Sequence, residues 1–238
     1  MSPASVPMVP ASTDLELFEG AARLWPRAFE PAEATQLFDE LRRDVQWQQE
    51  EIVIFGQRRQ VPRLVAWHGD AGASYVYSGT DHRPEPWTPV LARIRDQVQA
   101  LTGAPFNAVL LNLYRDGRDG MGWHADDEPE LGRDPVIASL SLGATRRFCL
   151  RHRRRKDLKL DLPLPHGSVL CMSGETQHHW LHAVPKTRLP VGDITLAKEC
   201  ADAGFHSQRP RDRRRARALG EPLECRPDER YVAGPGRR

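Results

Sequence analysis

Residues 112–126 read NLYRDGRDGMGWHAD, and this stretch combines a strand, a chain reversal and a pair of candidate metal ligands. Side chains alternate along an extended strand, so Asn112 and Tyr114 share one face. The Asp- and Gly-rich turn that follows reverses the chain. It delivers His124 and Asp126, which at positions i and i+2 also point to one side if the chain is extended. An imidazole and a carboxylate directed at one point form half of a metal site.

A third ligand should come from a distant strand, and residues 177–185, QHHWLHAVP, hold the candidate histidines. Two histidines and one carboxylate on one face of an octahedral ion leave the opposite positions open. Non-heme iron(II) oxygenases use this facial arrangement because cosubstrate and oxygen must both bind the metal. A zinc hydrolase uses the same residue types and is the competing chemistry. The HxD spacing by itself does not choose between them.

The rest of the chain predicts an α+β domain. One helix is expected over residues 31–43, with Pro31 at its start, and a second is expected to begin at Thr88-Pro89 with Thr88 as its cap. Short β-rich runs separated by Gly, Asp and Pro follow, at 107–114, 136–142, 147–151, 167–172 and 194–196. Helices followed by an antiparallel β-rich half indicate a jelly roll, or double-stranded β-helix, supported by N-terminal helices.

Composition excludes several classes of protein. The chain has 238 residues, of which 39% are hydrophobic and 28% charged, with a net charge of +2, as expected for a soluble globular domain. It lacks the apolar run of roughly 18 residues that a membrane helix needs. Four cysteines without a CxxC pair give no structural zinc site or disulfide framework. We therefore expect a cytoplasmic protein with a disordered leader over 1–14, a domain over 15–198 and a disordered basic tail over 199–238.

Two dense basic runs could neutralise phosphates, RHRRRK at 151–156 and RPRDRRRAR at 209–217. The first is equally consistent with a solvated surface, and the second is better explained by a disordered tail.

A wider set of motifs resembles one family. The pattern NxYxDGxDxxGxHxDxE over residues 112–128 is similar to the signature of the AlkB-like iron(II)- and 2-oxoglutarate-dependent dioxygenases. Further agreement follows in order along residues 45–190: VPR at 61–63, GDAG at 69–72, YVYSG at 75–79, PW at 86–87, IASLSLGATRRFCLRH at 137–152, LPHGSVLCM at 164–172 and HWLHAVP at 179–185. Together these motifs most resemble the branch of the family that repairs alkylated DNA bases.

The resemblance assigns roles by position. The iron ligands would be His124, Asp126 and His182, with His178 and His179 as rival candidates for the third. Asn112 and Tyr114 would hydrogen-bond 2-oxoglutarate. The alkylated base would meet Tyr75, Tyr77, Ser78 and Glu128, since a flipped base needs stacking and hydrogen bonds to offset its lost stacking. Trp67 and His68 are weaker candidates for the same pocket.

The resemblance also implies the reaction. Fe(II), the cosubstrate 2-oxoglutarate and O2 would oxidise an N-alkyl carbon of bases such as 1-methyladenine or 3-methylcytosine, releasing succinate, an aldehyde and the repaired base. The expected partner is alkylated DNA or RNA, and the expected state is a monomer. Two alternatives stay open: a damaged-nucleic-acid binding protein without turnover, and an oxygenase that acts on RNA or protein.

One strand departs from the family pattern. The family follows its distal histidine with RxNxTxR, whose final arginine pairs with the far carboxylate of 2-oxoglutarate. This chain reads PVGDITLAKEC, so the two arginine positions fall on Asp193 and Glu199. Lys198 is the neighbouring cation and the candidate to bind 2-oxoglutarate in place of this arginine, although it lies on the opposite face of the strand unless the register slips by one. A shifted reading frame near Val191 is one explanation, and resequencing the coding region would test it.

Overall fold

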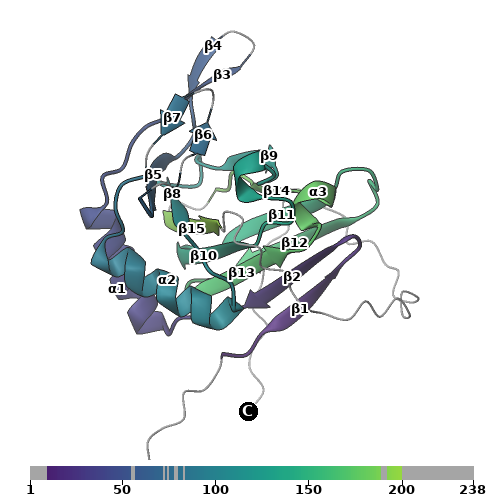
Figure 1. The fold of residues 1–238 in the computed structure, drawn as a ribbon, viewed down its shortest axis with the longest axis horizontal. Coiled ribbons are helices and arrows are strands. Elements are labelled where there is room, and N and C mark those ends of the chain that lie inside the picture. Colours follow the sequence, from purple (N-terminus) through teal and green to yellow (C-terminus); the bar gives the residue numbers. More distant parts are fainter. Residues whose placement is uncertain are drawn as a thin grey trace, which may run out of the picture.

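The computed structural model describes residues 10–54, 57–71, 73, 75–77, 80–82, 84–188 and 192–199. Two antiparallel sheets pack face to face, and two helices lie side by side along the outer face of the larger sheet (Figure 1). This arrangement confirms the predicted jelly roll with helical support.

The larger sheet has the strand order β1-β2-β13-β10-β15-β8-β5. Its strands are Thr13–Leu17 (β1), Gly20–Trp25 (β2), Leu64–Gly69 (β5), Ala108–Tyr114 (β8), Ile137–Gly143 (β10), Ser168–Ser173 (β13) and Asp193–Glu199 (β15). The smaller sheet has the order β12-β11-β14-β9. Its strands are Met121–His124 (β9), Arg146–His152 (β11), Lys159–Leu164 (β12) and Trp180–Val184 (β14).

Two hairpins complete the described strands: Glu51–Ile54 (β3) with Gln57–Gln60 (β4), and Tyr75–Tyr77 (β6) with Thr80–His82 (β7). The β3–β4 hairpin extends away from the sheets in Figure 1. A 3-10 turn at Pro129–Leu131 and a short helix at Thr176–His179 (α3) lie in the connections.

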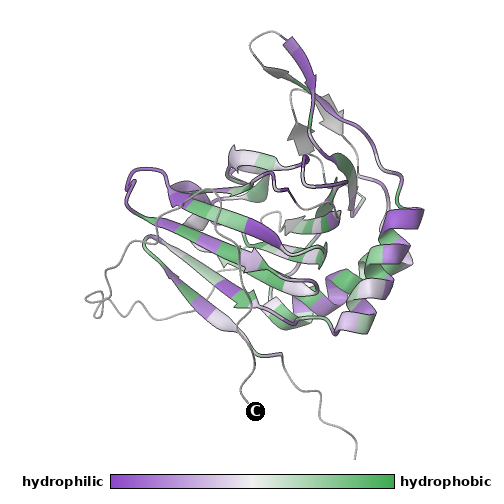
Figure 2. Ribbon diagram, turned by 180° about the vertical axis from the view of Figure 1, so that it is seen from behind, coloured by the Kyte–Doolittle hydropathy of each residue, from purple (hydrophilic) through white to green (hydrophobic). Residues whose placement is uncertain are grey.

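Both predicted helices are confirmed, as Pro31–Asp44 (α1) and Pro89–Thr102 (α2). The hydroxyl of Thr88 caps α2 by accepting a hydrogen bond from the backbone N–H of Leu91 at 3.3 Å. Each helix presents an apolar stripe to the larger sheet and polar residues to solvent, as the colouring of Figure 2 shows. No described helix is long and apolar enough to cross a membrane.

A second apolar core lies between the two sheets. It is formed by buried residues of both sheets, among them Ile137, Leu170, Phe148, Leu150 and Val184. The apolar side chains of β15 pack instead in the other core, which lies between the larger sheet and the two helices. Ile194 and Leu196 are fully buried there. By alternation, Asp193 and Thr195 therefore face the space between the sheets, where the candidate site lies.

Two features of the fold were not predicted. Strands β1 and β2 precede the helices and add an edge to the larger sheet through β13, and β1 begins at Thr13, inside the predicted leader. Strand β15 is paired along its whole length, with β10 on one side and β8 on the other. Residues 1–9 of the predicted leader and the tail from residue 200 lie outside the described residues, so the disorder predicted for them stays a prediction.

Candidate metal centre and pocket

The turn between β8 and β9 is held by long-range contacts as well as by local ones, such as the hydrogen bond from the backbone N–H of Arg115 to the carboxylate of Asp119. Gly120 donates its N–H to the carbonyl of Pro62, and the N–H of Thr187 donates to the carbonyl of Gly117. A Cβ atom at position 120 would lie 2.7 Å from the carbonyl oxygen of Val184, so only glycine allows β9 to approach β14 this closely. The close approach places β9 in register with β14.

This register joins the predicted metal ligands. His124 of β9 lies directly opposite His182 of β14. The Nε2 atom of His124 is 3.6 Å from one carboxylate oxygen of Asp126, and the Nε2 atom of His182 is 3.5 Å from the other. The three ligand atoms all lie within 4.8 Å of one another. The structure thus brings together the three residues that the resemblance assigns to the metal.

Both imidazoles are prepared to act as neutral ligands. The Nδ1 atom of His124 lies 2.9 Å from the carbonyl oxygen of Gly122, which only accepts, so Nδ1 carries the proton and Nε2 presents its lone pair to Asp126. Burial lowers the pKa of His124, helped by the charge of Arg63, and burial lowers the pKa of His182 well below its ordinary value. Two neutral imidazole nitrogens and one carboxylate suit a divalent transition metal.

Two residues that the sequence did not single out hold this cluster in place. Gln177 is buried in α3 and accepts the backbone N–H of Asp126 at 3.0 Å through its side-chain oxygen. The ring of Phe148 stacks on His182, with centroids 5.3 Å apart and planes inclined by 21°. Neither role has a local signal, because each partner lies more than 30 residues away in the sequence.

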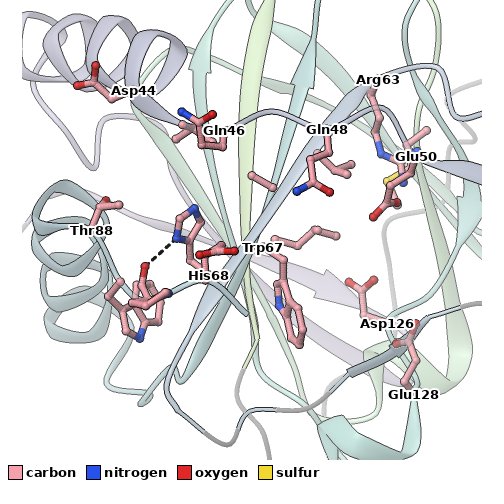
Figure 3. Close-up of a pocket in the computed structure, with 18 of the residues that line it drawn as sticks. Asp44, Gln46, Gln48, Glu50, Arg63, Trp67, His68, Thr88, Asp126 and Glu128 are labelled. Carbon is pink, nitrogen blue, oxygen red and sulfur yellow. Dashed lines mark hydrogen bonds between the residues drawn. The ribbon is translucent and has the colours of Figure 1, made fainter. Parts of the chain in front are cut away.

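A pocket of about 660 Å³ opens onto the metal ligands. Its walls are formed by residues 44–50, β5, residues 85–88 and the segment 121–128. Figure 3 shows Asp126 and Glu128 near each other on one side of the view, with Trp67 in the middle and His68 beyond it. Glu128 therefore lies where the resemblance expects a residue that meets the base, and Trp67 and His68 also line the pocket. The side chains of Tyr75 and Tyr77, and all of Ser78, lie outside the described residues.

Asn112 and Tyr114, the predicted cosubstrate residues, are both buried on β8. The Oδ1 atom of Asn112 accepts a hydrogen bond from Nε of Arg63 at 2.6 Å. Burial raises the pKa of the Tyr114 phenol, whereas the charges of Arg63 and Arg146 lower it. Two buried arginines thus flank the residues expected to contact an anionic cosubstrate, and neither arginine has a local sequence signal for this position.

Asp193, at one expected arginine position, is buried opposite Tyr114 in the register of β15 with β8. Its carboxylate accepts a hydrogen bond of 2.7 Å from Nη1 of Arg146. The anion expected to face the cosubstrate is therefore paired within the protein. The side chains of Lys198 and Glu199 lie outside the described residues, so the role predicted for Lys198 stays a prediction.

A second cluster, of Glu19, His152 and His179, also has its ligand atoms within 4.8 Å of one another. Here Nδ1 of His152 accepts the backbone N–H groups of Arg154 and Arg155, at 3.2 and 2.9 Å. The ring proton must then reside on Nε2, which donates to Glu19 at 3.1 Å. Because Nε2 has no lone pair to offer, this cluster is a hydrogen-bonded clasp between the β1–β2 turn and β11 and does not suit a metal.

The rival histidines are accounted for in the same region. His179 belongs to the clasp, with Nδ1 3.4 Å from the carboxylate of Glu19. His178 contacts the carbonyl oxygen of Arg133 and lies 3.3 Å from the carboxylate of Asp134. Neither belongs to the cluster of His124, Asp126 and His182.

The basic run at 151–156 makes local contacts at the rim of the site. Arg151 stacks on the exposed ring of Trp123 at 4.2 Å, Arg153 pairs with Asp127 at 2.6 Å, and Arg155 pairs with Asp157. The second run, at 209–217, lies outside the described residues.

Comparison with known proteins agrees with this geometry. The model of the 2OG-Fe(II) oxygenase superfamily matches residues 21–215. The chain is 43% identical over 183 residues to the human DNA oxidative demethylase ALKBH2, covering 71% of this chain and 70% of that protein. It is 42% identical over 172 residues to the bovine alpha-ketoglutarate-dependent dioxygenase alkB homolog 3, covering 68% of this chain and 59% of that protein.

The fold also matches a solved structure, described as the structure of OsALKBH1, with a TM-score of 0.58 and 16% identity. That match covers 79% of this chain and 100% of the other. At this identity the likeness concerns the fold alone.

Proposed function

This chain belongs to the 2OG-Fe(II) oxygenase superfamily, and we propose that it oxidatively removes alkyl groups from nucleic-acid bases in DNA repair. The observation that carries the proposal is the cluster of His124, Asp126 and His182, two of which, His124 and Asp126, line the pocket. Support comes from relatives named DNA oxidative demethylases at 41–43% identity.

The residues fit the group that this chemistry needs. His124, Asp126 and His182 would hold Fe(II), which when bound supplies the oxidation of an N-alkyl carbon by O2. Asn112 and Tyr114, flanked by Arg63 and Arg146, offer hydrogen bonds and positive charge to the dicarboxylate 2-oxoglutarate.

The pocket suits a flipped base. Its volume of about 660 Å³ is within the range of small-molecule sites, and the indole of Trp67 lines it. The carboxylate of Glu128 can accept a hydrogen bond from an exocyclic amino group and favours a cationic lesion, as in 1-methyladenine or 3-methylcytosine. We propose these bases as substrates, with DNA as the first candidate strand.

The test is release of succinate and formaldehyde from a 3-methylcytosine oligonucleotide supplied with iron, ascorbate and 2-oxoglutarate. His182→Ala should abolish release because it removes a metal ligand. His178→Ala is the matched control: it deletes a neighbouring imidazole outside the cluster and should keep turnover. An intact chain that leaves the oligonucleotide unchanged while binding metal would refute the activity.

A second candidate function is binding of alkylated nucleic acid without turnover. It is favoured by one observation, the anion Asp193 at a position where the family pattern has arginine. Retention of the methylated strand without succinate production would select it. Competition among methylated DNA, methylated RNA and peptide would separate an oxygenase for bases from one for protein. A monomeric state and a cytoplasmic location are further predictions, to be checked by light scattering and cell fractionation.

A further inference from the structure

A dicarboxylate cosubstrate needs a cation at the end that lies farthest from the metal. The arginines expected on β15 are replaced by Asp193 and Glu199. Asp193 lies opposite Tyr114, whereas Lys198 lies opposite Val109, five residues farther along β15. The backbone position of Lys198 is thus remote from Tyr114, and another element has to supply the charge there.

Arg146, at the start of β11, supplies a cation near Tyr114. Its guanidinium lies 5.2 Å from the ring of Tyr114 and donates from Nη1 to Asp193. Nη2 donates to the carbonyl oxygens of Asp119 and Pro185, each at 2.9 Å. The side chains of Arg146 and Asp193 are only 5% and 3% exposed. Three of the five N–H groups of Arg146 therefore have acceptors among the described residues, and two can take a further acceptor.

The distance from the metal ligands also fits. Arg146 and Phe148 are two residues apart on β11 and share its buried face. Phe148 stacks on the metal ligand His182. Two residues of strand advance about 7 Å, which is on the scale of a five-carbon dicarboxylate whose 2-oxo end lies at the metal.

Arg63, the other buried arginine among the described residues, lies on the side of Asn112 and the pocket. Its Nε bonds Asn112, and the residue lines the pocket together with His124 and Asp126. Arg63 is therefore placed beside the metal-ligand candidates His124 and Asp126, whereas Arg146 is not among the residues that line this pocket.

We propose that Arg146 binds the distal carboxylate of 2-oxoglutarate in this chain, and that Asp193 is a resident counterion that weakens this binding. The inference rests on the proposed function. Two carboxylates on one guanidinium repel each other, and the repulsion is strong where water is excluded. Replacing Asp193 by asparagine keeps an acceptor for Nη1 and removes the competing charge.

The experiment is calorimetric titration of the full chain, loaded with Mn(II), with two ligands. 2-Oxoglutarate carries the distal carboxylate, whereas pyruvate is a 2-oxo acid without it. Asp193→Asn should tighten 2-oxoglutarate binding by about tenfold and leave pyruvate binding unchanged. The double variant Arg146→Met with Asp193→Asn should lose at least about tenfold in its preference for 2-oxoglutarate over pyruvate. The double variant is used because Arg146→Met alone leaves Asp193 buried without a counterion.

The matched control is Arg147→Met, which makes the same change one residue along β11. The side chain of Arg147 is 45% exposed and lies 3.6 Å from Asp161 on the neighbouring strand. Arg147→Met should change neither the binding of 2-oxoglutarate nor the binding of pyruvate.

The outcomes separate this inference from the proposed function. If the double variant keeps the full preference for 2-oxoglutarate, or if Asp193→Asn weakens its binding, the role of Arg146 is refuted and the oxygenase assignment stands. If the metal-loaded wild type binds neither acid, both the cosubstrate assignment and this inference are refuted.

Discussion

Asp126→Asn should make the metal-free protein more stable while destroying its metal site. The Asp126 side chain is only 16% exposed, and its carboxylate faces two imidazoles that are neutral at pH 7. Burial raises the pKa of Asp126 to about 7, with further contributions from the charges of Glu128 and Asp127. Without a metal, the ionised carboxylate therefore has no compensating cation among the described residues.

The sign of the pH dependence follows from linkage. The folded pKa lies above the ordinary value of 3.8, so between these values the folded state binds more protons than the unfolded state. Stability falls as pH rises through this window, and the full cost is present above pH 7. At 1.36 kcal/mol per pKa unit the cost reaches about 4 kcal/mol, and partial exposure reduces it to roughly 2–4 kcal/mol.

Urea unfolding with EDTA at pH 4.5 and pH 8 measures this cost. Asp126→Asn should exceed wild type by about 2–4 kcal/mol at pH 8 and by about 1 kcal/mol or less at pH 4.5. Mn(II) at about 1,000 times Kd should cancel or reverse this order, because it adds about 4.1 kcal/mol to wild type alone.

The matched control is Asp127→Asn, which removes the adjacent carboxylate that pairs with Arg153 and is 39% exposed. It should bring no comparable gain. If Asp126→Asn is no more stable than wild type at pH 8 in EDTA, the ionised carboxylate does not lower the free energy of unfolding. The reasoning would then fail.

Three further predictions concern the support of the site. Arg146→Met should lower the free energy of unfolding by about 3–5 kcal/mol because it leaves the buried carboxylate of Asp193 without a counterion. In a double-mutant cycle, adding Asp193→Asn should recover most of this loss. Gln177→Ala should weaken Mn(II) binding by about 10–100-fold, measured by titration, because Asp126 loses its backbone anchor. Gly120→Ala should also weaken Mn(II) binding, because its Cβ would force β9 away from β14.

Controls and contrary outcomes differ among the three. Strictly additive effects of the two single changes would show that Arg146 and Asp193 are not coupled. The control for Gln177→Ala is His178→Ala, which alters the next residue of α3 outside the metal-ligand cluster. If both variants lost metal binding equally, disruption of the whole helix would explain the loss. For the glycine, Gly122→Ala is the comparison, because a Cβ at that position meets no atom within 4 Å. Equal effects at both glycines would remove the steric explanation.

The sequence determined the elements whose signals are local. Pro31 and the Thr88-Pro89 pair mark helix starts because capping and a fixed φ act within one turn. The β-rich runs at 107–114, 136–142 and 167–172 were recognisable because burial selects their side chains one by one. The HxD motif indicated His124 and Asp126 as candidate metal ligands because ligand chemistry restricts those positions to a few residue types, and the family resemblance chose His182 among three histidines.

Only the tertiary structure decided the contacts between distant segments. Strands β1 and β2 are short and partly polar, and pairing with β13 rather than their own pattern makes them strands. The pairing of Arg146 with Asp193 joins residues 47 positions apart. Which charges become neighbours depends on the order and register of strands in a sheet, and these are set by packing across the whole core. The sequence therefore showed an anion where an arginine was expected, and only the fold showed which cation lies against it.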